Sequence, residues 1–162
     1  MPVVWDTTLV SQIQPESWAL SYFESAVDTE GRVLIPATSV REVVWGHARA
    51  TAFEPRSWQL LRWLSRFLAR PDVSVLPLTR EAAFAAGRTR AGCPFPARSP
   101  RDRRSKPDRR VAWVNDMQIA ATAWAFCVPV ATENVADFTR LSELLAELYP
   151  RAKRLEVLAS PL

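Results

Sequence analysis

The chain has 162 residues, of which 48% are apolar and 23% are charged, a composition typical of one globular domain with a sizeable core. No stretch approaches the ~18 consecutive apolar residues of a membrane span and no signal peptide begins the chain, so we expect a cytoplasmic protein without membrane attachment. The two cysteines match no zinc spacing and indicate a reducing environment. We therefore treat residues 1–162 as a single domain.

The net charge of +4 conceals an uneven distribution. Residues 88–110 contain nine Arg or Lys and two Asp, a local charge of +7, which leaves twelve basic and fifteen acidic residues elsewhere, or −3. The Pro-rich part of this segment, at about 92–110, is interpreted as a basic loop insertion rather than a domain boundary. Such a loop is either a solvated spacer or a contact for a polyanion.

Hydrophobic periodicity predicts strands and helices that alternate along the chain. The first half begins with a strand at 2–5 and continues with a helix at 15–27, a strand at 33–37, and helices at 39–50 and 56–70. The second half has a strand at 73–78, helices at 79–92 and 115–126, a strand at 128–132, a short helix at 142–149 and a strand at 154–159. Because no hairpin signal joins any two strands, the pattern predicts an α/β fold with a five-stranded parallel sheet flanked by helices.

Four acidic residues fall where such a sheet would bring them together. Asp6 ends the first strand, Glu42 lies in the first turn of the helix after the second strand, Asp116 starts the helix before the fourth strand, and Asp137 follows that strand. Open parallel sheets bind ligands outside the carboxyl ends of their strands, where the strand order reverses. Clustered carboxylates raise one another's pKa values unless a cation neutralises them, and all-oxygen ligands suit Mg²⁺ or Mn²⁺.

Each acid also has a purely structural interpretation. Glu42 would complete a capping box at the start of its helix, and Asn115 would cap a helix whose dipole Asp116 complements. Asp137 would complement the dipole of the last helix in the same way. Asp6 is the hardest to explain structurally, since aspartate is disfavoured in strands and rare in cores. Taken together, the four acids favour a shared site.

Three segments of the chain resemble the signature regions of the PIN domain family, and within it those of the VapC-type toxins of bacterial toxin–antitoxin pairs. In chain order they are VVWDTTLVSQI, IPATSVREVVWGHA and NDMQIAATAWAFCVPVATENVADFTRL. The third is the most specific, with an Asp, then Ile-Ala-Ala-Thr-Ala, then a strand that leads into Thr-x-Asn-x-x-Asp-Phe. The resemblance spans nearly the whole chain, with residues 92–110 as its main departure.

The resemblance implies a PIN-like three-layer fold and a Mg²⁺- or Mn²⁺-dependent endoribonuclease. Its acidic quartet would be Asp6, Glu42, Asp116 and Asp137. The metal would be held by Asp6, Asp116 and Asp137, while Glu42 would hold or deprotonate the attacking water. Relatives place the fourth acid at either of two positions, and the other position here holds Asn134. The residues that would orient carboxylates or touch phosphate are Thr7, Thr8, Thr132 and Asn134, of which Thr8 stands where the family often has Asn.

The substrate of such an enzyme would be RNA, with its backbone bound by Arg101, Arg103, Arg104 and Lys106 of the basic loop. The resemblance also implies a homodimer and a small antitoxin protein whose C-terminal segment occupies the acidic groove. Two other functions stay open, a non-catalytic PIN-like module that binds RNA or protein and a housekeeping RNA-processing nuclease. A phosphatase with Asp6 as nucleophile is disfavoured, because such enzymes carry a second Asp where this chain has Thr8.

Overall fold

The computed structural model describes residues 1–96 and 104–160, and within these ranges no helix is long and apolar enough to cross a membrane. Five strands form one sheet in the order β3-β2-β1-β4-β5, and all neighbouring strands are parallel. The strands are β1 Val4–Trp5, β2 Val33–Pro36, β3 Val73–Leu76, β4 Val130–Thr132 and β5 Val157–Ala159. The predicted five-stranded parallel sheet is thus confirmed.

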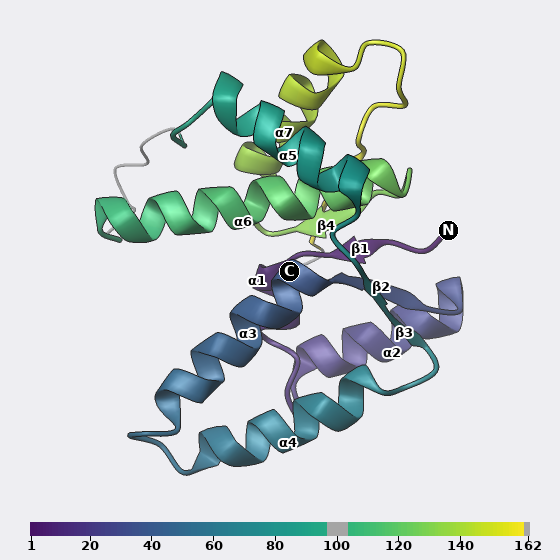
Figure 1. Cartoon of the computed structure of the whole chain (residues 1–162). Coiled ribbons are helices and arrows are strands. Elements are labelled where there is room, and N and C mark those ends of the chain that lie inside the picture. The colour runs from purple at the N-terminus through teal and green to yellow at the C-terminus, as the bar shows by residue number, and fades with distance from the viewer. Residues whose placement is uncertain (97–103, 161–162) are drawn as a thin grey trace.

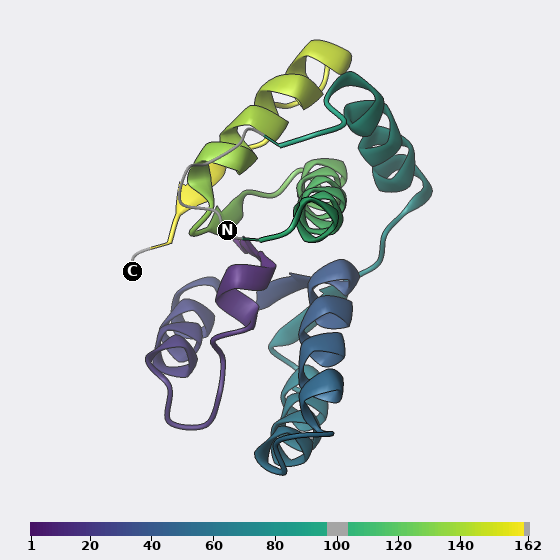
Figure 2. The same cartoon turned by 90° about the vertical axis from the view of Figure 1, so that its left-hand side faces the viewer.

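Helices cover both faces of this sheet, which gives three layers (Figures 1 and 2). One face carries α1 Thr7–Val10, α2 Trp18–Glu30, α3 Ala37–Ala50 and α4 Arg56–Leu68. The other face carries α5 Arg80–Gly92, α6 Lys106–Ala125 and α7 Val135–Leu148.

Neighbouring residues of each strand point to opposite faces of the sheet, and this alternation builds two separate cores. Val4 of β1 and Val130 of β4 pack in the core beneath α5, α6 and α7. Trp5 and Ala131, the next residues of the same strands, pack in the core beneath α2, α3 and α4. The inner strands β1, β2 and β4 are buried on both faces, which explains the short continuous apolar runs at these places in the sequence.

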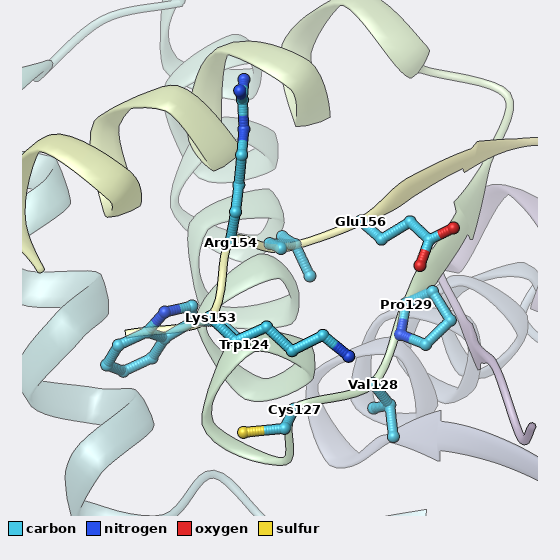
Figure 3. A pocket seen from close by; sticks show the side chains of 8 residues that line it. Trp124, Cys127, Val128, Pro129, Lys153, Arg154 and Glu156 are labelled. Atoms are coloured by element: carbon cyan, nitrogen blue, oxygen red, sulfur yellow. The ribbon is translucent and has the colours of Figure 1, made fainter. Parts of the chain in front are cut away.

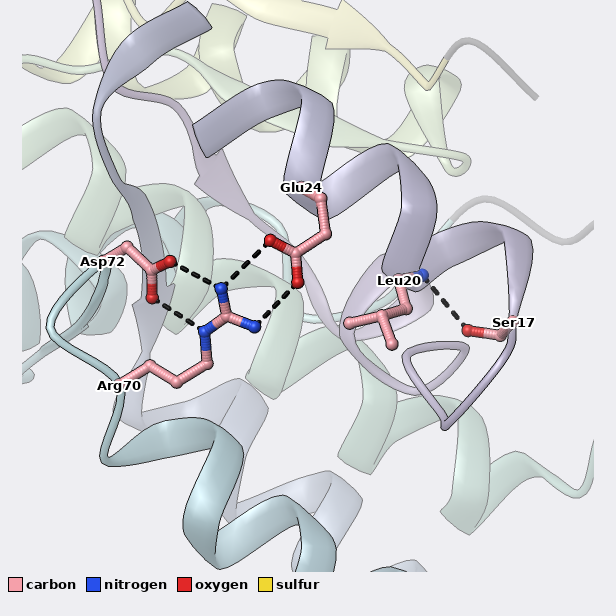
Figure 4. Close-up of polar contacts among 5 residues, drawn as sticks. All are labelled: Ser17, Leu20, Glu24, Arg70 and Asp72. Atoms are coloured by element: carbon pink, nitrogen blue, oxygen red, sulfur yellow. Dashed lines mark hydrogen bonds and ion pairs between the residues drawn. The ribbon is translucent and has the colours of Figure 1, made fainter. Parts of the chain in front are cut away.

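Arg70, which follows α4, fastens helix α2 to the segment that leads into β3 (Figure 4). Its guanidinium donates to both carboxylate oxygens of Glu24, at 2.7 and 3.0 Å, and to both of Asp72, at 2.9 and 2.6 Å. The guanidinium also lies 5.0 Å from the centre of the Phe23 ring. These hydrogen bonds hold the pKa of Asp72 below its usual range. At the start of α2, the Ser17 hydroxyl provides the N-cap.

Helix α6 begins at Lys106, nine residues before the predicted start at 115, so Asp116 lies within a helix of 20 residues rather than at its beginning. The Ser105 hydroxyl caps it by accepting from the backbone N–H of Asp108 at 3.3 Å. Pro107 falls in the first turn, where its missing N–H costs no hydrogen bond. The prediction of a loop up to residue 110 is therefore wrong for residues 106–110, which are helical, while 97–103 lie outside the described residues.

Two further helix starts differ from the predictions. Helix α3 begins at Ala37 with no side-chain cap, so the predicted capping box between Ser39 and Glu42 is wrong and Glu42 lies in the second turn. Helix α7 begins at Val135, seven residues earlier than predicted. Asp137 lies in its first turn, where a carboxylate complements the helix dipole as expected.

Candidate active site

The acidic residues gather at the C-terminal edge of the sheet, beside β1 and β4. From β1 the chain adds β2 and β3 on one side, and then returns to add β4 and β5 on the other. This change of direction marks the position where open α/β sheets bind ligands. Asp6 directly follows β1, and Thr132 is the last residue of β4. The Thr132 hydroxyl donates to Asp6 Oδ2 at 2.6 Å, which ties the two strand ends together.

Asp6 is 2% exposed and caps the short helix α1, an element that the sequence did not predict. Its Oδ1 accepts from the Thr8 hydroxyl at 2.6 Å, from the Thr8 backbone N–H at 3.0 Å and from the Leu9 N–H at 3.3 Å. Burial raises the pKa of Asp6, and the hydrogen bonds from Thr132 and Thr8 oppose that rise. Asp6 therefore has a structural task as well as a place in the acidic cluster.

Glu42 is held by two neutral donors from distant parts of the chain. Thr7 Oγ1 donates to Glu42 Oε2 at 2.5 Å, and Asn115 Nδ2 donates to Glu42 Oε1 at 2.6 Å. Arg41 Nη2 in turn donates to Asn115 Oδ1 at 2.6 Å. Asn115 was predicted to cap a helix, and this prediction is wrong. It is an interior residue of α6 that holds Glu42 in place. The sequence did not predict that Asn115 holds Glu42 or that Arg41 holds Asn115. The sequence signal that could have pointed to them is that each directly precedes a candidate acid.

Asp116 lies among the other three carboxylates, although part of its surface still faces solvent. Burial raises the pKa of Asp116 to about 8, with further contributions from the charges of Asp6, Glu42 and Asp137, while Arg104 opposes the rise. Asn134 lies between Asp116 and Asp137, and its backbone N–H donates to Thr132, which in turn donates to Asp6. Asn115, the residue directly before Asp116, donates to Glu42, so the four acids share one neighbourhood. The structure therefore brings the predicted quartet together, and the catalytic roles of its members remain predictions.

Asn134 connects two of these carboxylates. Its Nδ2 donates to Asp137 Oδ2 at 2.9 Å and lies 3.5 Å from Asp116 Oδ2. Its backbone N–H donates to the Thr132 hydroxyl at 2.9 Å. Both alternatives for the fourth acidic position thus lie at the site, since Asp137 supplies a charge and Asn134 supplies a neutral donor between two carboxylates.

A divalent cation fits the chemistry of this site. The side chains offer carboxylate, hydroxyl and amide oxygens, which suit Mg²⁺ and Mn²⁺. Burial is the main cause of the raised pKa of Asp116, and the neighbouring carboxylates add negative charge that a cation would balance. In the described parts of the chain, however, no group of three or more His, Cys, Asp and Glu side chains is already arranged to hold a metal ion. A bound cation would therefore draw the carboxylates into a closer arrangement than the one seen here.

Two of the four basic residues predicted to contact an RNA backbone can be placed. The two that lie outside the described residues are Arg101 and Arg103. Arg104 precedes α6, and its charge acts on the acidic cluster. Lys106 begins α6, with its ammonium group 5.7 Å from the centre of the Phe95 ring. The charge of Lys106 is thus positioned by a helix and an aromatic ring, not by a loop.

A small hollow lies at the opposite edge of the sheet, where α6 turns into β4 (Figure 3). Trp124, Cys127 and Lys153 are among the residues that line it, and its volume is about 10 Å³. A cavity of this size holds at most about one water molecule, which excludes a nucleotide or cofactor. The exposed thiol of Cys127 therefore belongs to the surface and not to a second ligand site.

The architecture is the PIN-like three-layer α/β fold. No protein-family model and no curated protein sequence matches the chain. Among solved structures it is similar to VapBC2 from Rickettsia felis bound to a DNA fragment from its promoter, with a TM-score of 0.64 and 16% identity over 99% of both chains. It is also similar to FitAcB from Neisseria gonorrhoeae, with a TM-score of 0.59 and 18% identity over 98% of this chain and 96% of that chain. It is similar as well to DNA-bound VapBC from Salmonella typhimurium, with a TM-score of 0.60 and 16% identity over 98% of both chains. At these identities the likeness shows the fold, and function has to be argued from the site.

Proposed function

We propose that this protein is a Mg²⁺- or Mn²⁺-dependent endoribonuclease and the toxin of a type II toxin–antitoxin pair. The observation that carries the proposal is the assembly of Asp6, Glu42, Asp116 and Asp137 beside the point where the strand order reverses. Four carboxylates in one neighbourhood destabilise a fold, so such a cluster favours a functional role. The likeness of fold to VapBC structures agrees with the resemblance to VapC-type toxins.

The acidic residues have different tasks in this proposal. Asp6, Asp116 and Asp137 would hold the cation, which supplies positive charge opposite the scissile phosphate and lowers the pKa of a water molecule. Glu42 would hold or deprotonate the attacking water, and its two neutral donors aim its carboxylate.

Neutral side chains keep the remaining carboxylates in place. Thr8 and Thr132 donate to Asp6, and Asn134 donates to Asp137. Hydroxyl and amide donors orient a carboxylate without cancelling the charge that a cation needs, which is the usual task of residues behind metal ligands.

The proposed partners are an RNA substrate, a small antitoxin protein and a second copy of this chain. RNA would bind with its backbone against the basic residues around the start of α6. The antitoxin would keep the enzyme inactive by occupying the acidic centre. The test of the toxin role is a short neighbouring reading frame whose product copurifies with this chain, stops RNA cleavage and relieves growth arrest.

The test of the enzymatic activity is cleavage of an RNA panel with Mn²⁺, with Mg²⁺ and with a chelator. Asp6→Asn should abolish cleavage while keeping the fold, because asparagine is as good an N-cap for α1 as aspartate. Asp28→Asn, which makes the same change on the exposed surface of α2, should cleave like the wild type. Cleavage that persists in chelator or in the Asp6→Asn protein would contradict the proposal.

A non-catalytic module that binds RNA or protein is the second candidate. Two observations favour it. Glu42 and Asp137 accept hydrogen bonds from neutral side chains, and among the described residues no group of acids is already arranged as metal ligands. This alternative predicts RNA binding that survives Asp6→Asn and no cleavage at any Mn²⁺ concentration. A housekeeping nuclease, by contrast, predicts the same cleavage as a toxin but no antitoxin and no growth arrest.

A further inference from the structure

Beside Glu42, a cleft of about 380 Å³ opens between α3 and α6. Its lining residues are Arg41, Glu42 and Trp45 of α3, and Val111 and Asn115 of α6. Figure 1 shows the two helices leaving the sheet edge in the same general direction and diverging. The volume falls in the range of about 300–1,000 Å³ that is typical of small-molecule sites. The cleft thus begins at the acidic centre and leads away from the sheet.

Helical spacing places the outer part of this cleft one turn from the acidic centre. Trp45 follows Glu42 by three residues on α3, and Val111 precedes Asn115 by four residues on α6, so each pair shares a helix face. The hydrogen bond from Asn115 to Glu42 joins the two helices at the inner end. Trp45 and Val111 therefore form the walls next to the position where the attacking water would be held.

Trp45 presents an open aromatic surface in this cleft. Its side chain is 60% exposed, and Val111 on the other helix is 61% exposed. The guanidinium of Arg49 lies over the indole ring, with its carbon 4.7 Å from the ring centre, so a cation already contacts this aromatic surface. With this exposure the ring has room for a second flat group, and the positive charge beside it favours a group that carries a phosphate.

We propose that this cleft is a base-stacking subsite, in which an unpaired nucleobase next to the scissile bond packs against Trp45 while Arg49 faces the backbone. This inference rests on the proposed function, because it requires RNA in the acidic centre. Aromatic stacking holds single-stranded nucleic acid with little sequence preference, since every base has a flat face. The substrate is therefore a single-stranded segment, because paired bases inside a duplex cannot reach the ring.

The first experiment measures RNA affinity in an Asp116→Asn background, so that the RNA stays intact. Trp45→Ala should weaken binding of single-stranded oligonucleotides by about 5- to 150-fold, equivalent to ~1–3 kcal/mol for one stacked base. Trp45→Phe should retain most of the affinity, because it keeps an aromatic ring. Trp58→Ala is the matched control and should leave affinity unchanged, since Trp58 on α4 is also 60% exposed and does not line the cleft.

The second experiment separates stacking from a structural role of Trp45, with oligonucleotides that each lack one base. When the missing base is the one that stacks on Trp45, the Asp116→Asn protein should lose the same affinity that Trp45→Ala has already lost. The two proteins should then bind this oligonucleotide equally well. A difference that persists at every position would overturn the inference, as would equal affinity of the Asp116→Asn protein and Trp45→Ala for intact RNA. Loss of self-association in Trp45→Ala with unchanged RNA affinity would also overturn it, and would assign the cleft to a protein interface.

Failure of the proposed function gives a different result. In that case the wild type shows no metal-dependent cleavage and the Asp116→Asn protein binds no RNA, which overturns both proposals. RNA that is bound and cut equally well by the wild type and by Trp45→Ala overturns the subsite alone.

Discussion

Replacing Asp116 by Asn should stabilise the metal-free protein and reduce the pH dependence of its stability. Burial and three neighbouring carboxylates raise the pKa of Asp116 from 3.8 to about 8. Between these two values the folded protein keeps a proton that the unfolded chain has released, so the free energy of unfolding falls as the pH rises. The penalty is absent below a pH of about 4 and complete above a pH of about 8.

The size of the effect follows from these pKa values. Each pH unit within the window costs about 1.4 kcal/mol, so the penalty is at most about 4 kcal/mol at pH 7. Asparagine stays neutral and has nearly the same shape as aspartate. We expect Asp116→Asn to gain about 2 kcal/mol at pH 7, because solvent at the partly exposed side chain screens some of the repulsion, and to gain nothing at pH 4.

The assay is urea unfolding of the wild type, Asp116→Asn and Asp28→Asn at pH 4, 5, 7 and 8 in chelator. Asp28→Asn, on the exposed surface of α2, should follow the wild type at every pH. Millimolar Mn²⁺ should stabilise the wild type most at pH 8, because a bound cation removes the repulsion, and should stabilise Asp116→Asn little. Parallel stability curves for wild type and Asp116→Asn, or a wild type indifferent to Mn²⁺, would refute the shared charged site.

Three further predictions concern other parts of the molecule. Arg70→Ala should lower the free energy of unfolding by about 1–3 kcal/mol, because it removes the paired hydrogen bonds of Figure 4. Arg66→Ala, at an exposed position of α4, should change it little in the same urea titrations. Thr7→Ala should reduce the cleavage rate about 10- to 100-fold without weakening RNA binding, because Glu42 loses one donor, and Thr7→Ser should restore the rate. Replacing the four basic residues by Ser should flatten the salt dependence of RNA affinity by about 0.7 in log–log slope per lost contact, and equal slopes across a salt series would assign them another task. These four are Arg101, Arg103, Arg104 and Lys106.

The sheet could be predicted from the sequence because its signals are local. Short apolar runs separated by helical periodicity, without hairpin turns, leave few arrangements other than a parallel sheet covered on both faces. The start of α6 was missed because the basic, Pro-rich composition outweighed a capping signal. Ser105 followed by Asp108, with Pro107 in the first turn, is a helix start that the sequence already contains. Helix α1 has only four residues, too few for periodicity to reveal.

Asp6 could be anticipated at this edge because it follows a strand, and Asp137 because it lies in the first turn of the helix after β4. Glu42 and Asp116 reach the same edge from the second turn of α3 and from the interior of α6, not from the predicted helix starts. Of their neutral partners, the resemblance already gave Thr7, Thr8, Thr132 and Asn134 as expected carboxylate contacts. The role of Asn115 could not be predicted, because its contact depends on how distant side chains meet in space. The contact between Asn115 and Glu42 joins residues 73 positions apart, and no spacing rule relates them. The exposure of Trp45 is equally invisible in the sequence, since a tryptophan at a helical position is more often buried.

The corrected start of α6 changes how the basic residues can act on the acidic centre. Lys106 and Asp116 lie ten residues apart on one helix, which sets their backbones about 15 Å apart. Exposed charges separated by more than about 8 Å are largely screened at physiological ionic strength, so Lys106 can act on a substrate only by direct contact. Arg104 differs, because its charge acts on Asp116. It lowers the pKa of that carboxyl, whereas burial and the other three acids raise it. A polyanion held at the start of α6 therefore meets the acidic centre at a distance fixed by the helix, not by a flexible tether.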